Sequence, residues 1–121
     1  MSTAKESLSM LSELEGFLGA CIVDSNSGMM LGATGSSGEL NLELAAAGNT
    51  EVVRAKLKTL KTLNLNDSIE DILITLGRQY HLLRPLSSNR ALFIYLALDR
   101  KRANLALARH QLTAAENGLQ V

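Results

Sequence analysis

The chain has 121 residues, and 46% of them are hydrophobic, which is enough for one buried core and too little for two. The 12 Lys and Arg residues equal the 12 Asp and Glu residues in number, so no overall field attracts nucleic acid or an anionic membrane. Only 3% of residues are aromatic, which leaves few platforms for stacking single-stranded bases. We therefore expect one domain over residues 1–121 that binds no nucleic acid.

Cysteine usage and hydropathy bear on the compartment. A single cysteine, Cys21, cannot form an internal disulfide, and the opening residues MSTAKESLSM carry no apolar run of signal-peptide length. The longest apolar run, residues 91–98, is far shorter than the roughly 20 residues that a membrane helix requires. The expectation is a cytoplasmic protein with no direct membrane insertion.

The first elements are a short helix and a hairpin. Leucines recur at helical spacing over residues 3–14, which predicts an amphipathic helix. Residues 17–23 (FLGACIV) predict a buried strand. The turn-forming run 24–28 (DSNSG) then returns the chain as a second strand over residues 29–34.

A long helix is predicted over residues 39–63, and Ser36 with Glu39 has capping-box spacing for its start. Gly48 lies in the middle of this helix, where a kink is allowed for. One narrow arc of apolar residues should lie on the sheet, and it contains Leu42, Ala46, Val53, Leu57 and Leu60.

The same helix carries more apolar surface than one sheet contact needs. A second arc contains Ala45, Val52 and Leu63, and a third is lined by the cations Arg54, Lys58 and Lys61. The surplus indicates a second partner for the helix.

Three further strands are predicted over residues 68–76, 79–86 and 91–98. In the last of them the side chains that point to either face of the sheet are apolar, so it should be a central strand with both faces buried. Asp99 is expected to cap a final helix, whose apolar stripe is formed by Leu105, Ala108, Leu112 and Ala115.

The order of these elements resembles the roadblock/dynein-light-chain family, including bacterial small-GTPase regulators. The resemblance is carried by the hairpin FLGACIVDSNSGMMLGAT, by VVRAKLKTL at the end of the second helix, by RQYHLLRP, and by the closing LFIYLALDR and ANLALAR. It implies an α/β (α+β) fold: a profilin-like five-stranded antiparallel sheet with the first and last helices on one face and the second helix on the other. It also implies a homodimer that acts as a non-enzymatic adaptor or regulator, binding a small GTPase or a motor-type NTPase.

The surplus arc and the resemblance together place a dimer interface on the second helix and the strand after it. The proposed residues are Ala45, Val52, Ala55, Lys56, Leu63, Ile72 and Ile74. The basic run Arg100, Lys101 and Arg102 is the candidate surface for a different, anionic partner, although exposed cations are often simply solvated.

No constellation of residues indicates catalysis, a metal or a cofactor. Cys21, His81 and His110 fall on two different strands and a helix, which is not a metal-ligand spacing. The glycines of GATGSSG lack the Gly-Lys-Ser/Thr ending of a phosphate loop, so a flexible connection is favoured there. The alternative to a GTPase regulator is a structural or small-ligand-sensing scaffold, with a pocket between the sheet and the terminal helices.

Overall fold

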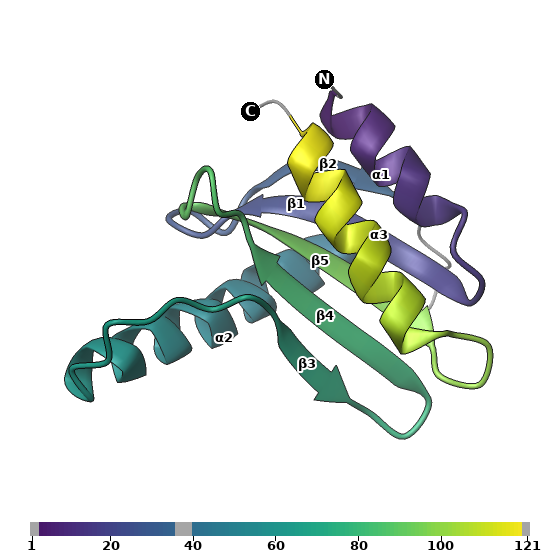
Figure 1. The fold of residues 1–121 in the computed structure, drawn as a ribbon. Coiled ribbons are helices and arrows are strands. Elements are labelled where there is room, and N and C mark those ends of the chain that lie inside the picture. Colours follow the sequence, from purple (N-terminus) through teal and green to yellow (C-terminus); the bar gives the residue numbers. More distant parts are fainter. Residues whose placement is uncertain (1–2, 36–39, 120–121) are drawn as a thin grey trace.

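The computed structural model describes residues 3–35 and 40–119, which form three helices and a five-stranded antiparallel sheet (Figure 1). The elements in chain order are α1 (Ala4–Ser12), β1 (Phe17–Asp24), β2 (Met30–Thr34), α2 (Leu42–Thr62), β3 (Ile72–Thr75), β4 (Gln79–Pro85), β5 (Leu92–Asp99) and α3 (Leu105–Gly118). The predicted fold class and the predicted order of elements are confirmed.

β5 lies at the centre of the sheet, whose strand order is β2-β1-β5-β4-β3. All of its residues from Leu92 to Leu98 are buried, because side chains of both parities face a packed layer. The predicted central strand is therefore confirmed. β2 and β3, which lie far from β5 in this order, form the two edges of the sheet.

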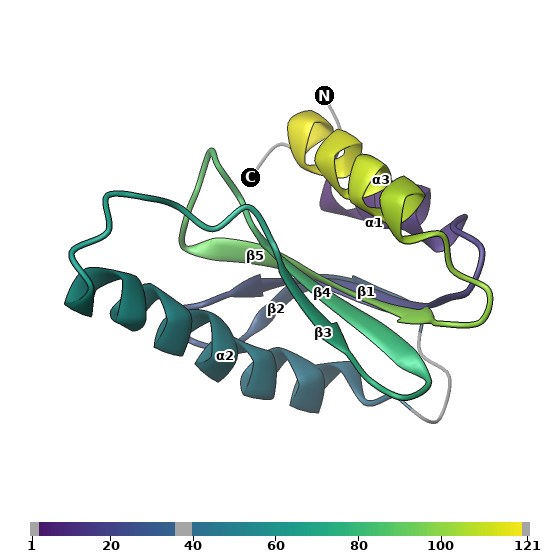
Figure 2. The ribbon, with the colours of Figure 1, turned by 60° about the horizontal axis from the view of Figure 1, so that its bottom comes forward.

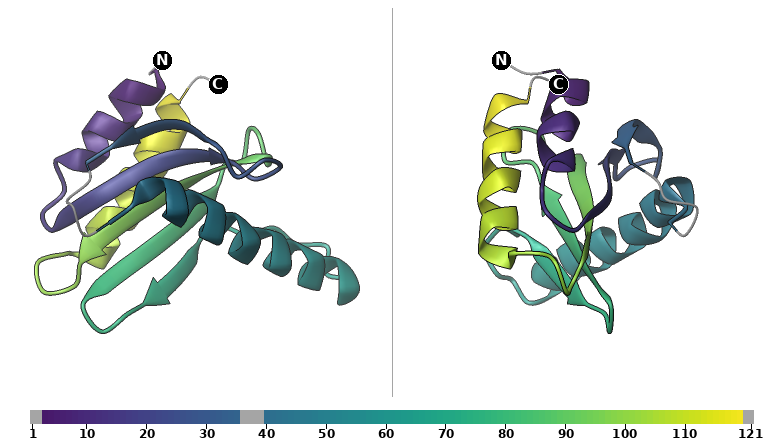
Figure 3. Two further views of the ribbon diagram at one scale, coloured as in Figure 1. Left: turned by 180° about the vertical axis from the view of Figure 1, so that it is seen from behind. Right: turned by 90° about the vertical axis from the view of Figure 1, so that its right-hand side faces the viewer.

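The two faces of the sheet are covered by different helices, as Figures 2 and 3 show. α1 and α3 lie side by side on one face, and α2 lies on the other. Leu8 of α1 and Leu112 of α3 fill the first layer together with Ile22, Ile94 and Leu96. The second layer joins Leu42, Ala46 and Val53 of α2 to Cys21, Val23, Leu83, Phe93, Tyr95 and Ala97 of the sheet.

Only the first half of α2 lies on the sheet, so the predicted sheet-facing arc is only partly correct. Leu42, Ala46 and Val53 are buried, whereas Leu57 is 36% exposed and Leu60 is half-buried. The C-terminal half of α2 projects beyond the sheet (Figure 2). Periodicity reports which residues share a face of a helix, and it does not report how far the opposing layer extends.

The start and the middle of α2 also differ from expectation. Asn41 is the N-cap, and its side-chain oxygen accepts a hydrogen bond from the Leu44 amide at 3.1 Å. The predicted capping pair, Ser36 and Glu39, lies outside the described residues. The helix is uninterrupted at Gly48, so the kink that was allowed for does not occur.

The cap of α3 is Asn104 rather than Asp99. The Asn104 side chain accepts from the Leu107 amide at 3.0 Å. Asp99 ends β5 instead, and its carbonyl oxygen accepts from the amides of Arg102 and Ala103 in the turn that follows. The predicted helix start was too early because an aspartate can organise a turn as readily as a cap.

Candidate interaction surfaces on α2 and β3

A groove lies between the second half of α2 and the beginning of β3. It has a volume of about 590 Å³ and is lined by Val52, Ala55, Lys56, Thr59, Asp71 and Ile72. Four of these residues, Val52, Ala55, Lys56 and Ile72, belong to the interface predicted from the sequence. We call this the α2–β3 groove.

Three of the four α2 residues that line the α2–β3 groove, Val52, Ala55 and Thr59, have short side chains, and the fourth is Lys56. Val52 is 38% exposed, and Ala55 is exposed as well. Short side chains such as these allow a second helix to approach closely. Exposed apolar surface at this place has no partner within the described chain.

The other three predicted interface residues lie around the α2–β3 groove rather than in it. Ala45 and Ile74 are half-buried against the α2 side of the sheet. Leu63 is the C-cap of α2 and is 58% exposed. The structure therefore brings four predicted residues together and spreads the remaining three along the same side of the molecule.

β3 presents an open strand edge beside the α2–β3 groove. Its four residues pair with β4 on one side, and no described strand pairs with the other. The strand is held in place by Asp71, whose two carboxylate oxygens accept from Arg109 Nε at 3.0 Å and Nη2 at 3.2 Å. An ordered edge with unpaired backbone groups is a template for another strand.

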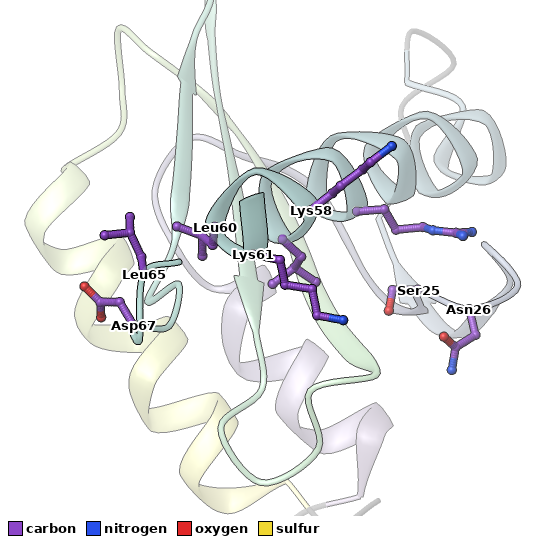
Figure 4. Close-up of a pocket in the computed structure, with 9 residues that line it drawn as sticks. Ser25, Asn26, Lys58, Leu60, Lys61, Leu65 and Asp67 are labelled. Carbon is purple, nitrogen blue, oxygen red and sulfur yellow. The ribbon is translucent and has the colours of Figure 1, made fainter. Parts of the chain in front are cut away.

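A second groove lies along the projecting half of α2 and shares no lining residue with the α2–β3 groove (Figure 4). It has a volume of about 560 Å³ and is lined by Ser25, Asn26, Arg54, Leu57, Lys58, Leu60, Lys61, Leu65 and Asp67. We call it the basic groove. The sequence indicated the cationic arc of α2, but it gave no signal that the β1–β2 turn and residues 65–67 would enclose it.

The basic run after β5 divides into one structural residue and two free ones. Arg100 donates from Nη1 to the carbonyl oxygen of Leu76 at 2.9 Å, and its guanidinium carbon lies 5.3 Å from the centre of the Tyr80 ring. It therefore ties the turn after β5 to the β3–β4 hairpin. Lys101 and Arg102 are exposed and form no ion pair with any described residue.

Cys21 and His81 are both held within the sheet by packing or hydrogen bonds. Burial raises the pKa of the Cys21 thiol to about 12, so the thiolate that a nucleophile requires is disfavoured. His81 Nε2 lies 2.7 Å from the amide oxygen of Gln79, and the Tyr95 hydroxyl lies 3.3 Å from Nδ1. Burial lowers the pKa of His81 and raises that of Tyr95 to about 12. His110 is exposed on α3, far along the chain from the other two residues.

The described residues contain neither a metal-binding cluster nor a membrane-spanning helix. Residues 3–35 and 40–119 contain no group of three or more His, Cys, Asp or Glu side chains arranged to hold a metal ion. In the same part of the chain, no helix has the length and hydrophobicity that crossing a bilayer requires.

The fold is that of a roadblock-type domain. A solved roadblock/LC7 domain from Streptomyces avermitilis has a TM-score of 0.80 at 8% identity, covering 96% of this chain and 93% of that one. Myxococcus xanthus MglB has a TM-score of 0.79 at 14% identity, covering 93% and 84%. An MglB structure described as having a tetrameric arrangement has a TM-score of 0.77 at 16% identity, covering 93% and 82%.

The likeness is one of fold, because identity is low throughout. Neither the comparison with protein-family models nor that with curated proteins gives a match. The resemblance predicted from the sequence is thus confirmed for the architecture.

Proposed function

We propose that this protein is a homodimeric, non-enzymatic adaptor or regulator that binds a small GTPase or another NTPase in the cytoplasm. The single observation that carries the proposal is the exposed apolar surface of α2 beside the open edge of β3. The roadblock-type fold and its likeness to MglB support the same reading.

The dimer would form about a two-fold axis next to β3. Two open β3 edges can pair with each other and join two five-stranded sheets into one of ten strands. The small residues of the two α2–β3 grooves would then face each other, covering Val52 and Ala55. Ala45, Lys56, Leu63, Ile72 and Ile74 complete the proposed interface. The tetrameric arrangement described for an MglB supports self-association in this fold.

Such a dimer would present a symmetric surface rather than an active site. A joined sheet with paired α2 helices offers a broad platform, which suits binding to a folded partner. The choice of a GTPase or related NTPase follows from the resemblance to the roadblock family. Members of that family regulate or anchor such proteins.

The alternative, a scaffold that senses a small ligand, is less favoured. Packed leucines fill the centre of the layer between the sheet and the terminal helices, and Leu8, Leu11 and Leu112 are each at most 2% exposed. A groove of about 460 Å³ lies at the margin of this layer, between α1 and β2. A ligand deeper in the layer would require the leucines to move apart.

The proposal is tested by affinity capture from native lysate, using the tagged protein with a non-hydrolysable GTP analogue or with GDP. Recovery of one GTPase-fold protein, more in one nucleotide state than in the other, would support it. The matched control is Val52→Glu, which should lower the recovery by disrupting the dimer. If no nucleotide-binding protein is enriched under either condition, the proposed partner class is wrong.

A further inference from the structure

The basic groove lies outside the proposed dimer interface. The α2–β3 groove opens between α2 and β3, whereas the basic groove opens between α2, the β1–β2 turn and residues 65–67 (Figure 4). The two grooves share no lining residue, so a dimer that meets through β3 and the α2–β3 groove would leave the basic groove open.

Three cations line the basic groove without anions to match them. Arg54, Lys58 and Lys61 lie three and four residues apart, so they share one side of the helix. None of them forms an ion pair with a described residue, and the only carboxylate that lines the groove is that of Asp67. Like charges at this spacing destabilise an isolated helix slightly. A local excess of positive charge in a protein of zero net charge points to an anionic occupant.

The floor of the basic groove is apolar. Three leucines line it: Leu57 is 36% exposed, Leu65 is 52% exposed, and Leu60 is half-buried. A free phosphate or nucleotide would leave these leucines in water. An occupant that satisfies both the leucines and the cations must itself be apolar on one side and acidic on the other.

We propose that the basic groove docks an acidic amphipathic segment of a partner protein. Its apolar side chains would cover Leu57, Leu60 and Leu65, while its Asp and Glu side chains would meet Arg54, Lys58 and Lys61. The proposal rests on the proposed function in taking the occupant to be part of a bound protein, and it names the chemistry by which that protein is recognised.

The probe for this site is a short synthetic helical peptide with leucines on one face and glutamates on the other. Its affinity is measured by fluorescence anisotropy for the wild-type protein and for the triple variant Arg54→Glu, Lys58→Glu, Lys61→Glu. We expect the triple variant to bind at least about tenfold more weakly, because attraction becomes repulsion. A peptide with lysines in place of the glutamates should bind the triple variant more tightly than the wild type.

The matched control carries three charge reversals elsewhere: Lys5→Glu, Lys101→Glu and Arg102→Glu. All three positions are exposed and lie away from the basic groove. This variant should bind the glutamate peptide within about twofold of the wild type, apart from a small long-range effect of net charge. If the control loses as much affinity as the groove variant, the binding is non-specific and the proposal is wrong.

A methyl NMR titration of the wild type locates the peptide independently of the charge reversals. The methyl signals of Leu57, Leu60 and Leu65 should shift on addition of the glutamate peptide, while those of Leu8 and Leu112 should stay in place. Shifts confined to other surfaces would overturn the proposal. So would binding of anionic phosphatidylglycerol vesicles or a DNA duplex to the groove in preference to the peptide.

Sedimentation of the same samples separates this proposal from the proposed function. A wild-type dimer that does not bind the glutamate peptide would refute the basic groove as a docking site and leave the dimer proposal intact. A monomer that binds the glutamate peptide would refute the dimer proposal and leave the basic groove as a docking site.

Discussion

Glu116 near the end of α3 accepts a hydrogen bond from Nε of Arg84 on β4 at 2.7 Å. The second carboxylate oxygen of Glu116 accepts from both the amide and the hydroxyl of Ser87. Glu116 is only 5% exposed. One buried carboxylate, which accepts three hydrogen bonds, thus fastens α3 to β4 and to the chain that leaves it.

Replacing Glu116 by Gln should destabilise the fold without altering its architecture. The substitution removes the negative charge opposite Arg84 and exchanges a pure acceptor for an amide that also carries donors. The expected loss is about 3 kcal/mol, since one partner of a buried charged pair is left uncompensated. Urea unfolding monitored by circular dichroism measures it. A loss below about 0.5 kcal/mol would mean that the cluster contributes little.

The same carboxylate should make stability depend on pH in acid. Burial alone would raise the pKa of Glu116, but the hydrogen bonds from Ser87 and Arg84 outweigh burial and hold the pKa below its ordinary value of 4.5. The folded state therefore binds fewer protons than the unfolded state, and the stabilisation present above pH 4.5 is lost as pH falls through the lower folded pKa. Glu116→Gln should flatten the stability profile in this range, and an unchanged profile would contradict the assignment.

His81 should produce a second loss of stability at milder pH. Burial lowers its pKa below the ordinary 6.5, so below that pH the unfolded chain takes up a proton that the folded chain resists. Stability should therefore fall as pH drops below 6.5, until the folded imidazole is also protonated. Thermal unfolding of His81→Gln between neutral and weakly acidic pH tests this: the slope should shrink relative to the wild type, and an unchanged slope would exclude His81 as its source.

Cys21→Ala should affect stability alone. The side chain projects from β1 into the layer between the sheet and α2 and is fully buried, so its loss leaves a small void that costs about 1 kcal/mol. Because burial raises the thiol pKa to about 12, alkylation of the native wild type at pH 8 should be much slower than that of the unfolded chain. Rapid native alkylation, or loss of partner binding in the variant at unchanged melting temperature, would revive a chemical role.

The basic run after β5 should separate into two kinds of residue on mutation. Arg100→Ala removes the hydrogen bond to Leu76 and the contact with Tyr80, and it should cost about 1 kcal/mol. The double variant Lys101→Ala, Arg102→Ala removes exposed side chains and should stay within about 0.5 kcal/mol of the wild type. Equal effects of the two variants in urea unfolding would show that Arg100 is not a structural tie.

Much of the fold could be predicted because apolar periodicity was consistent along the chain. β5 was predicted from the absence of alternation between residues 91 and 98, and the β1–β2 hairpin from the turn residues between its strands. The boundaries that were wrong involve residues with two physical options. Asp99 can cap a helix or form a turn, and Asn104, five residues further on, is the cap that the final helix uses.

The interaction surfaces were harder to predict because they depend on where layers end. The arc containing Leu57 and Leu60 is continuous with that of Val53 in sequence, yet the sheet does not extend beneath it. Similarly, Asn26 and Leu65 are far apart in the chain and line one groove only because the β1–β2 turn and the α2–β3 connection flank the same helix. Cluster residues such as Glu116 carry no local signal, since their partners are 29 and 32 residues away.

Sedimentation velocity at micromolar concentration tests whether the protein forms the proposed dimer through α2 and β3. The wild type should sediment as a dimer. Val52→Glu should sediment as a monomer, because it places an unpaired carboxylate in the interface at a cost of several kcal/mol. Lys101→Glu, a charge change of similar kind on an exposed turn, should remain dimeric. A monomeric wild type, a dimeric Val52→Glu variant or a dissociated Lys101→Glu variant would contradict the proposed interface.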